Sequence, residues 1–251
     1  MKFNIQHINQ CDSTNAYLQR LVAETDAPEG TVVSTSFQTN GRGQLSNVWE
    51  AEEGKNILCS ILLRPTSLPI KSQFLISQAI SVAIVDVLNS YLDGFFIKWP
   101  NDIYYKEDKI AGILIENTLS AAGISTCIIG LGLNVNQQTF KSNAPNPISL
   151  FNIIGRETSV SQLLQSILER FNRVYELAYT NVALLRENYF NNLLFNGKMR
   201  MYSDEGGEFI GKIVDVENDG HLIIEDIEGE KRRYAFKEVT FQLGVTLPTK
   251  C

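Results

Sequence analysis

The chain contains few of the residues that build metal or disulfide frameworks. Its 251 residues include 4 cysteines, which are scattered without any Cys-x-x-Cys pair, and only 2 histidines. Structural zinc sites and disulfide scaffolds need several such residues at close, repeated spacings. We therefore expect no metal held by the protein alone and no disulfides. We expect reduced thiols in a reducing compartment, by default the cytoplasm.

The chain also lacks a basic excess and a long hydrophobic run. It has 22 Lys and Arg against 28 Asp and Glu, a formal net charge of −6. Proteins that wrap nucleic acid are usually basic, so we expect no nucleic-acid partner. The N-terminus shows no apolar run behind a basic start. The most apolar segment, 74–88, is interrupted by polar residues, so the sequence predicts no membrane span.

No standard nucleotide-binding motif is present either. The chain has no Gly-x-x-x-x-Gly-Lys-Ser/Thr segment. Gly41-Arg42-Gly43 lacks the third glycine of a dinucleotide fingerprint and opens no predicted helix, and the same holds for Gly130-Leu-Gly132. An ATP site in this chain must therefore be built in another way.

What the sequence does contain is a regular series of helix and strand patterns. Apolar residues recur at helical spacing over 12–26, 72–92, 161–179 and 182–194. Apolar and β-branched runs predict strands over 31–37, 56–63, 95–99, 109–117 and 125–135, the last three as consecutive antiparallel strands. These patterns predict an α+β domain over residues 1–195, with a mixed or antiparallel sheet and helices on one side.

The pattern changes at Asn196-Gly197. Short alternating strands are predicted over 198–202, 208–216, 221–227 and 231–236, and glycine-containing turns separate them. Residues 196–251 are therefore predicted to form a small β-barrel domain.

Two stretches form a candidate anion site. Arg42 lies between two glycines in a loop, 38–55, that is long for a compact domain, and glycine lets the backbone approach a ligand closely. Lys109 begins a predicted strand soon after the segment Lys98-Trp-Pro-Asn-Asp102. Such cations suit a phosphate or a carboxylate. Taken alone, both cations could instead be solvated, and Lys98–Asp102 could be no more than a rigid turn.

Five motifs, in order, resemble those of the biotin protein ligase family. They are Ser13-Thr14-Asn15, the Gly41–Trp49 loop, Lys98–Asp102, Lys109–Glu116 and Ile129-Gly130-Leu-Gly132-Leu-Asn134. The resemblance implies a class II synthetase-like biotin/lipoate ligase domain followed by an SH3-like barrel. It also implies the activity: biotin and ATP, with Mg²⁺, give biotinyl-5′-AMP, and biotin then passes to a lysine of a biotin carboxyl carrier domain of a carboxylase.

The resemblance further assigns roles to residues. Lys109 and Arg42 are the expected catalytic cations, Trp49 is expected to stack on adenine, and Mg²⁺ is expected near Asn101. The expected biotin contacts are Ser13, Thr14, Asn15, Gln38, Gly41, Arg42, Lys109, Gly112 and Gly130. The expected ATP and adenylate contacts are Arg42, Gly43, Gln44, Trp49, Asn101, Lys109, Gly132 and Asn134.

The chain departs from the family pattern in the Gly41–Trp49 loop. Gln44 stands where the family has a second arginine, Ser46 where it has glycine, and Asn47 where many members have arginine. The resemblance favours a biotin ligase. A lipoate or octanoate ligase or transferase of the same architecture is an alternative, and the altered loop motivates another, a non-catalytic biotin-binding module. The first motif begins close to Met1, so we expect no N-terminal DNA-binding domain. A homodimer is compatible with the sequence.

Overall fold

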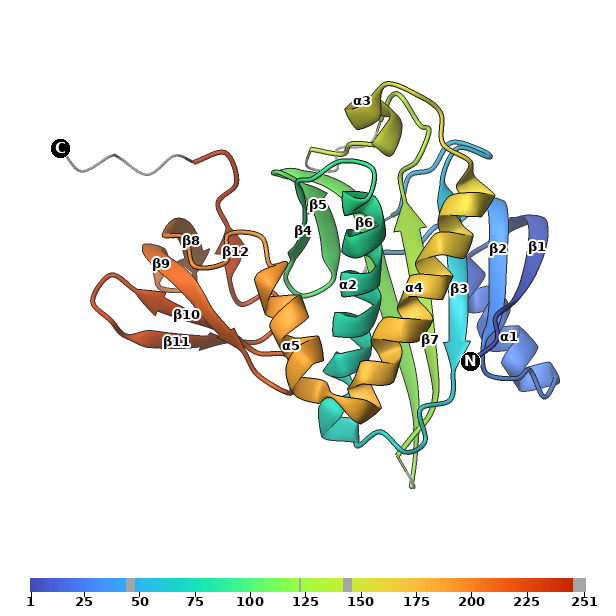
Figure 1. The fold of residues 1–251 in the computed structure, drawn as a ribbon, viewed down its shortest axis with the longest axis horizontal. Coiled ribbons are helices and arrows are strands. Elements are labelled where there is room, and N and C mark those ends of the chain that lie inside the picture. Colours follow the sequence, from blue (N-terminus) through green and yellow to red (C-terminus); the bar gives the residue numbers. More distant parts are fainter. Residues whose placement is uncertain (44–47, 122, 142–145, 246–251) are drawn as a thin grey trace.

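The computed structural model describes residues 1–43, 48–121, 123–141 and 146–245, which form two sheets and their flanking helices (Figure 1). In chain order the elements are β1 (Asn4–Cys11), α1 (Thr14–Glu24), β2 (Thr31–Gln38), β3 (Ile57–Leu63), the 3₁₀ turn η1 (Ile70–Ser72), α2 (Phe74–Asn89), β4 (Phe95–Lys98), β5 (Asp102–Tyr105), β6 (Asp108–Ser120), β7 (Gly123–Leu133), α3 (Leu150–Ile154), α4 (Val160–Thr180), α5 (Val182–Asn191), β8 (Arg200–Asp204), β9 (Gly207–Val216), β10 (Leu222–Asp226), β11 (Lys231–Tyr234) and β12 (Thr240–Phe241).

The larger sheet has seven strands in the order β1-β2-β3-β7-β6-β5-β4. β1 runs parallel to β2, and every other neighbouring pair is antiparallel, so the sheet is mixed. This confirms the predicted α+β class. β5 was not predicted and lies between β4 and β6, so the expectation that β4, β6 and β7 are consecutive strands was wrong. The sequence pattern did not reveal β5 for two reasons. The strand has only four residues, and it follows Pro100 and Asn101, which are residues typical of turns.

Helices cover both faces of this sheet, and not one face as the sequence suggested. α2 and α4 pack on one face over the large apolar core (Figure 1). α1 packs on the other face, where Leu18 meets Val33, Leu62 and Ile128 in a smaller cluster. Adjacent residues of one strand, such as Ile61 and Leu62, therefore belong to different cores, as the two-residue period of a strand requires.

The segment Ile70–Asn89 is long and apolar enough, by length and composition alone, to cross a membrane. In the fold it is mostly buried, and α2 contacts α4, α5, β4 and β5. Its apolar side chains are buried against these elements, which identifies it as a core helix.

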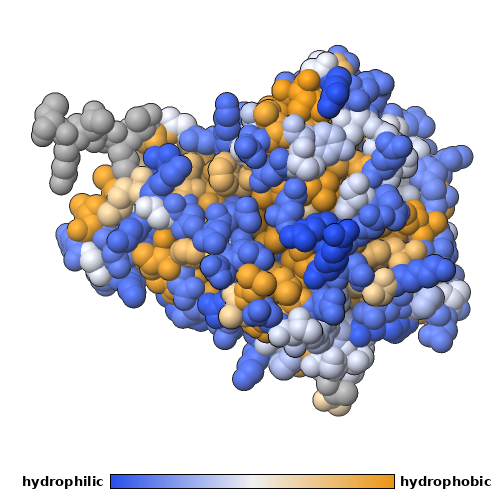
Figure 2. Space-filling model, in the orientation of Figure 1, coloured by the Kyte–Doolittle hydropathy of each residue, from blue (hydrophilic) through white to orange (hydrophobic). Residues whose placement is uncertain are grey.

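The smaller sheet is antiparallel, with strand order β11-β10-β9-β8-β12, and is consistent with the predicted small barrel. It rests on the larger unit beside α5 and β4 (Figure 1). Trp99 Nε1 donates a 2.8 Å hydrogen bond to the Gly220 carbonyl, and Arg186 donates to Asn218 at 2.5 Å and to the Val216 carbonyl at 3.0 Å. Hydrophilic side chains cover most of the molecular face in Figure 2, with hydrophobic groups in scattered patches.

Candidate active site

A cavity of about 1080 Å³ opens on the face of the sheet that carries α1. It runs from the start of α1, across β7, β6, β5 and β4, to the loop between β11 and β12. Although the chain has a net charge of −6, four described residues lining the cavity are basic and one is acidic. They are Arg42, Lys98, Lys109, Lys237 and Asp102. A concave surface lined mainly by cations concentrates anions.

One end of the cavity is a hydrogen-bond network at the start of α1. The Thr14 backbone N–H donates to Gln38 Oε1 at 2.7 Å, and Ser60 donates to Thr14 Oγ1 at 2.8 Å. Asn15 is 3% exposed, and its amide donates to Glu116 Oε2 at 2.6 Å. Buried amides held in this way have one orientation, so they present fixed donors and acceptors. Ser13 is the N-cap residue, but within the described chain its side chain makes no capping bond, which leaves its hydroxyl free to face the cavity.

The floor of the cavity is a row of residues that are register partners across four strands. Lys98 pairs with Asp102, Asp102 with Gly112, and Gly112 with Gly132. Residues paired in this way lie side by side on one face of the sheet. The row therefore carries a cation at one end, a carboxylate next to it, and two positions without side chains at the other end.

A β-bulge brings Lys109 to the same face. Ile103 pairs with Ala111 and Tyr104 pairs with Lys109, so Ile110 is an extra residue on β6. Without this bulge, the alternation of a strand would put Lys109 and Gly112 on opposite faces. With the bulge, Ile110 is fully buried in the core, and Lys109 Nζ forms a 2.7 Å ion pair with Asp102.

Trp49 lies flat over the glycine end of the row. A Cβ added to Gly132 would lie 2.5 Å from Trp49 Cε2, and one added to Gly112 would lie 3.0 Å from Trp49 Cζ3. Lys109 Nζ is 5.9 Å from the centroid of the indole. The indole Nε1 is buried and has no partner among the described residues. Glycine at 112 and 132 thus makes room for the indole, whereas Gly130 makes room for the amide of Asn15.

Arg42 begins the loop on which Trp49 lies. Arg42 pairs with Val48 in an isolated bridge, and the Trp49 N–H donates to the Gly41 carbonyl at 3.0 Å, so the two ends of the loop are held together. The guanidinium lies 3.7 Å from Glu116 Oε2, a long contact between partly exposed groups. Arg42 is therefore loosely held and free to turn toward a ligand.

Eleven of the residues that the sequence singled out line the cavity, namely Ser13, Thr14, Asn15, Gln38, Arg42, Gly43, Trp49, Lys109, Gly112, Gly130 and Gly132. Gly41, Asn101 and Asn134 are not among its lining residues. The Asn101 amide donates to the Ile113 carbonyl, and the Asn134 amide donates to the Ile148 carbonyl at 3.0 Å. Gln44 lies outside the described residues. Asp102, next to Asn101, is the acidic side chain that faces the cavity instead.

The sequence did not identify the contribution of the C-terminal unit or of Lys98. Phe236, Lys237 and Phe241 line the far end of the cavity. Phe236 stacks edge-on against Trp99, with ring centroids 6.2 Å apart, and Phe241 lies over Lys98. The available signal was the composition of the Lys-Trp-Pro-Asn-Asp segment, because contacts with residues as distant in sequence as Phe236 and Phe241 leave no local pattern.

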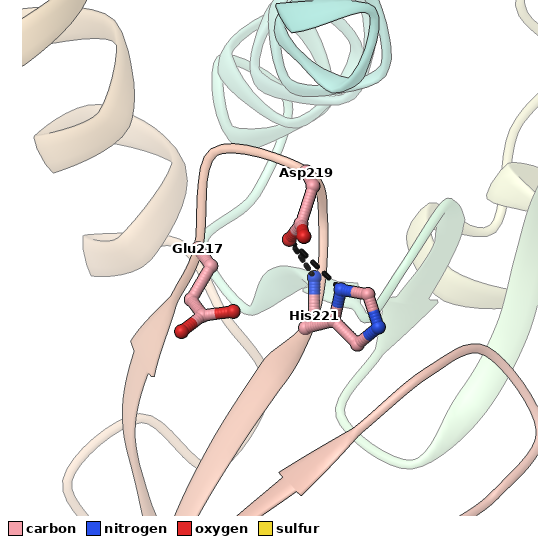
Figure 3. Close-up of side chains that lie close together, drawn as sticks. All are labelled: Glu217, Asp219 and His221. Carbon is pink, nitrogen blue, oxygen red and sulfur yellow. Dashed lines mark hydrogen bonds and ion pairs between the residues drawn. The ribbon is translucent and has the colours of Figure 1, made fainter. Parts of the chain in front are cut away.

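A second group of titratable residues lies outside the cavity, at the turn between β9 and β10. Figure 3 shows the backbone N–H and ring of His221 directed at Asp219, with Glu217 beside them. His221 Nδ1 is 2.8 Å from Asp219. Arg233 is 2.6 Å from Glu217 and 2.8 Å from Asp219, so its guanidinium forms ion pairs with both carboxylates. This arrangement is a charge-paired turn.

Comparisons with known proteins identify relatives of this chain. The sequence model of the biotin/lipoate A/B protein ligase family matches residues 8–134. The bifunctional ligase/repressor BirA of Bacillus spizizenii is 33% identical over 224 residues, 85% of this chain and 67% of that protein. The biotin–[acetyl-CoA-carboxylase] ligase of Mycobacterium tuberculosis is 25% identical over 87% of this chain and 82% of that protein.

Among solved structures, the biotin protein ligase from Aquifex aeolicus in complex with biotin and ATP matches with a TM-score of 0.78 and 25% identity. The match covers 94% of this chain and 97% of that one, so it includes both sheets. The matched family segment, residues 8–134, also contains every described cavity residue contributed by the first seven strands and α1. The chain therefore belongs to the biotin/lipoate A/B protein ligase family, as a relative of the biotin protein ligases.

Proposed function

We propose that this protein activates biotin with ATP and transfers it to a lysine of a biotin carboxyl carrier domain in the cytoplasm. The observation that carries the proposal is the convergence of the family motifs on one cavity. Ser13–Asn15, Arg42 and the floor residues Lys109, Gly112 and Gly132 come from separate segments between residues 13 and 132, and all of them line it. Its lining offers fixed polar groups at one end and cations in the middle.

In this proposal the ureido ring of biotin lies toward Asn15 and Gln38, and its carboxylate lies between Arg42 and Lys109. Trp49 then forms the platform for adenine. In the first step a carboxylate oxygen attacks the α-phosphorus, and the two cations balance the negative charge that concentrates there. In the second step the carrier lysine attacks the mixed anhydride, and the enzyme contributes mainly by positioning the reactants.

Mg²⁺ accompanies ATP in the proposed reaction. Among the described residues, Asp102 offers the carboxylate that lines the cavity, and hard oxygen ligands of this kind suit Mg²⁺. We therefore assign Asp102, rather than Asn101, as the protein group that would hold the ion. The ion would supply additional neutralisation of phosphate charge.

The test is to incubate the purified protein with biotin, ATP, Mg²⁺ and a biotin carrier domain, and to locate a biotin amide on one lysine by mass spectrometry. Parallel reactions with lipoate and octanoate, and one without ATP, complete the design. Pyrophosphate exchange that depends on biotin alone among the three acids is expected. Exchange supported by lipoate or octanoate instead would assign the other branch of the family, and no exchange with any acid would refute the enzymatic function.

A further inference from the structure

The far end of the cavity contains a cation that the mechanism above leaves unused. Lys98 closes the register row on β4, and its ammonium lies 4.8 Å from the Phe241 ring centroid and 5.8 Å from that of Tyr104. No carboxylate in the described part of the chain forms an ion pair with it, because the neighbouring Asp102 is paired with Lys109 at 2.7 Å. Asp102 therefore lies next to two lysines in the sheet and is paired with one of them.

This arrangement is unfavourable for the ligand-free protein. Lys98 is partly buried at the cavity wall, with its ammonium against the ring of Phe241 and without an ion-pair partner among the described residues. A charge that is removed from water without an opposite charge beside it costs stability. Groups that reduce stability are often retained because they bind a ligand.

The position of Lys98 identifies the part of the ligand that would use it. Neighbouring strands are about 4.8 Å apart, so Lys98 on β4 lies roughly 10 Å across the sheet from Lys109 on β6. If the α-phosphate lies at Lys109, as the proposed function requires, the direction along the row through Asp102 leads to Lys98. An extended polyphosphate chain covers that span.

We infer that Lys98 binds the β- and γ-phosphates of ATP and stabilises pyrophosphate as it leaves, and that the C-terminal unit positions Lys98 through Phe241. The inference rests on the proposed function. A biotin carboxylate oxygen forms a bond to the α-phosphorus, and the bond from that phosphorus to the α–β bridging oxygen breaks. The electron pair leaves with pyrophosphate, without proton transfer or redox change. Lys98 accordingly serves the first step and has no task in the second.

The test separates the two steps in Lys98→Met, Lys98→Arg and the wild type. Pyrophosphate exchange reports the first step, and transfer from supplied biotinyl-5′-AMP to a carrier domain reports the second. We expect Lys98→Met to lose about a hundredfold in exchange, as for other charge-stabilising groups, while transfer changes less than threefold. Lys98→Arg should recover at least part of the exchange.

Lys106→Met is the matched control, because Lys106 lies in the same hairpin region but outside the cavity, with its ammonium 5.3 Å from the Tyr105 ring centroid. It should leave both steps unchanged. Thermal melting should show a higher melting temperature for ligand-free Lys98→Met than for the wild type. In the presence of biotin, magnesium pyrophosphate should stabilise the wild type and not Lys98→Met.

The outcomes distinguish the inference from the proposed function. Wild-type protein that performs neither step refutes the proposed function. Wild-type activity in both steps with unimpaired exchange in Lys98→Met refutes the role of Lys98. Equal loss of both steps with a lower melting temperature would show instead that Lys98 is structural. If Lys98→Met does not fold, the melting temperature of the wild type with magnesium pyrophosphate and biotin is the deciding measurement. A melting temperature that pyrophosphate does not raise would overturn the inference.

Discussion

Adding one methyl group at Gly132 should weaken ATP binding through Trp49. The new Cβ would lie 2.5 Å from Cε2, 2.7 Å from Nε1 and 2.9 Å from Cδ2 of the indole. Carbon atoms in contact are about 3.5–4.0 Å apart, so the ring must move by about 1 Å. If Trp49 is the adenine platform, this displacement affects the nucleotide and not the biotin end of the cavity.

The expected magnitude follows from two contributions. A side chain forced off its rotamer costs about 0.5–1.5 kcal/mol, and loss of an aromatic stacking contact costs about as much again. The sum, about 2 kcal/mol, corresponds to an increase of about thirtyfold in the dissociation constant for ATP. Calorimetric titration of ATP or a non-hydrolysable analogue in the presence of biotin measures it. Biotin affinity in the absence of nucleotide should change less than threefold.

Two further variants make this prediction specific. A Cβ added at Gly112 would lie 3.0 Å from the same ring, which is farther than the 2.5 Å at Gly132. Gly112→Ala should therefore weaken ATP binding less than Gly132→Ala does. The phenylalanine ring of Trp49→Phe is smaller and would not contact the new methyl group. In a Trp49→Phe background, Gly132→Ala should therefore change ATP affinity little. Such non-additivity is the signature of direct contact. Additive effects, or unchanged ATP affinity in Gly132→Ala, would refute the reasoning.

Three more outcomes follow from the described contacts. Lys109→Ala should slow adenylate formation about a hundredfold, or about 3 kcal/mol, in a stopped pyrophosphate-release assay, and a near-normal rate would return the residue to a solvated role. Glu116→Gln keeps an oxygen that accepts the hydrogen bond from the Asn15 amide, and it loses only the long ion pair with Arg42. Biotin affinity should therefore change less than threefold. Glu116→Ala should lose about tenfold, and equal effects of the two variants would contradict this. Burial raises the pKa of Cys59 and Cys127 to about 12, so neither should be alkylated at pH 8 until the protein unfolds, as mass mapping would show.

Much of the fold could be predicted because burial leaves strong patterns in the sequence. β3 is a continuous apolar run, and α2 and α4 have long helical repeats. β1 was missed because it is an edge strand of mainly polar residues, with no buried face to impose a pattern. α3 was missed because it has only five residues.

The site was predictable to the extent that its residues lie in local motifs. The Ser13–Asn15 network and the glycines at 112, 130 and 132 were identified, although the neighbours that fill the space at those glycines were not. Asn101 was named from the family resemblance and Asp102 was given no role, because sequence alone does not show which of two adjacent side chains faces the cavity. Contributions made by long-range docking, such as Phe241 over Lys98, leave no signal at either position.

The extra residue in β6 lets this strand fill the core and still present Lys109 to the cavity. Removing Ile110 would give β5 and β6 an unbroken ladder, in which Lys109 would stand two residues before Gly112 and stay on the cavity face. The loss would fall on the core, where the side chain of Ile110 is fully buried. Deletion of Ile110 should therefore lower the melting temperature and leave the ammonium of Lys109 beside Asp102. The bulge thus serves packing and catalysis at the same point of the strand.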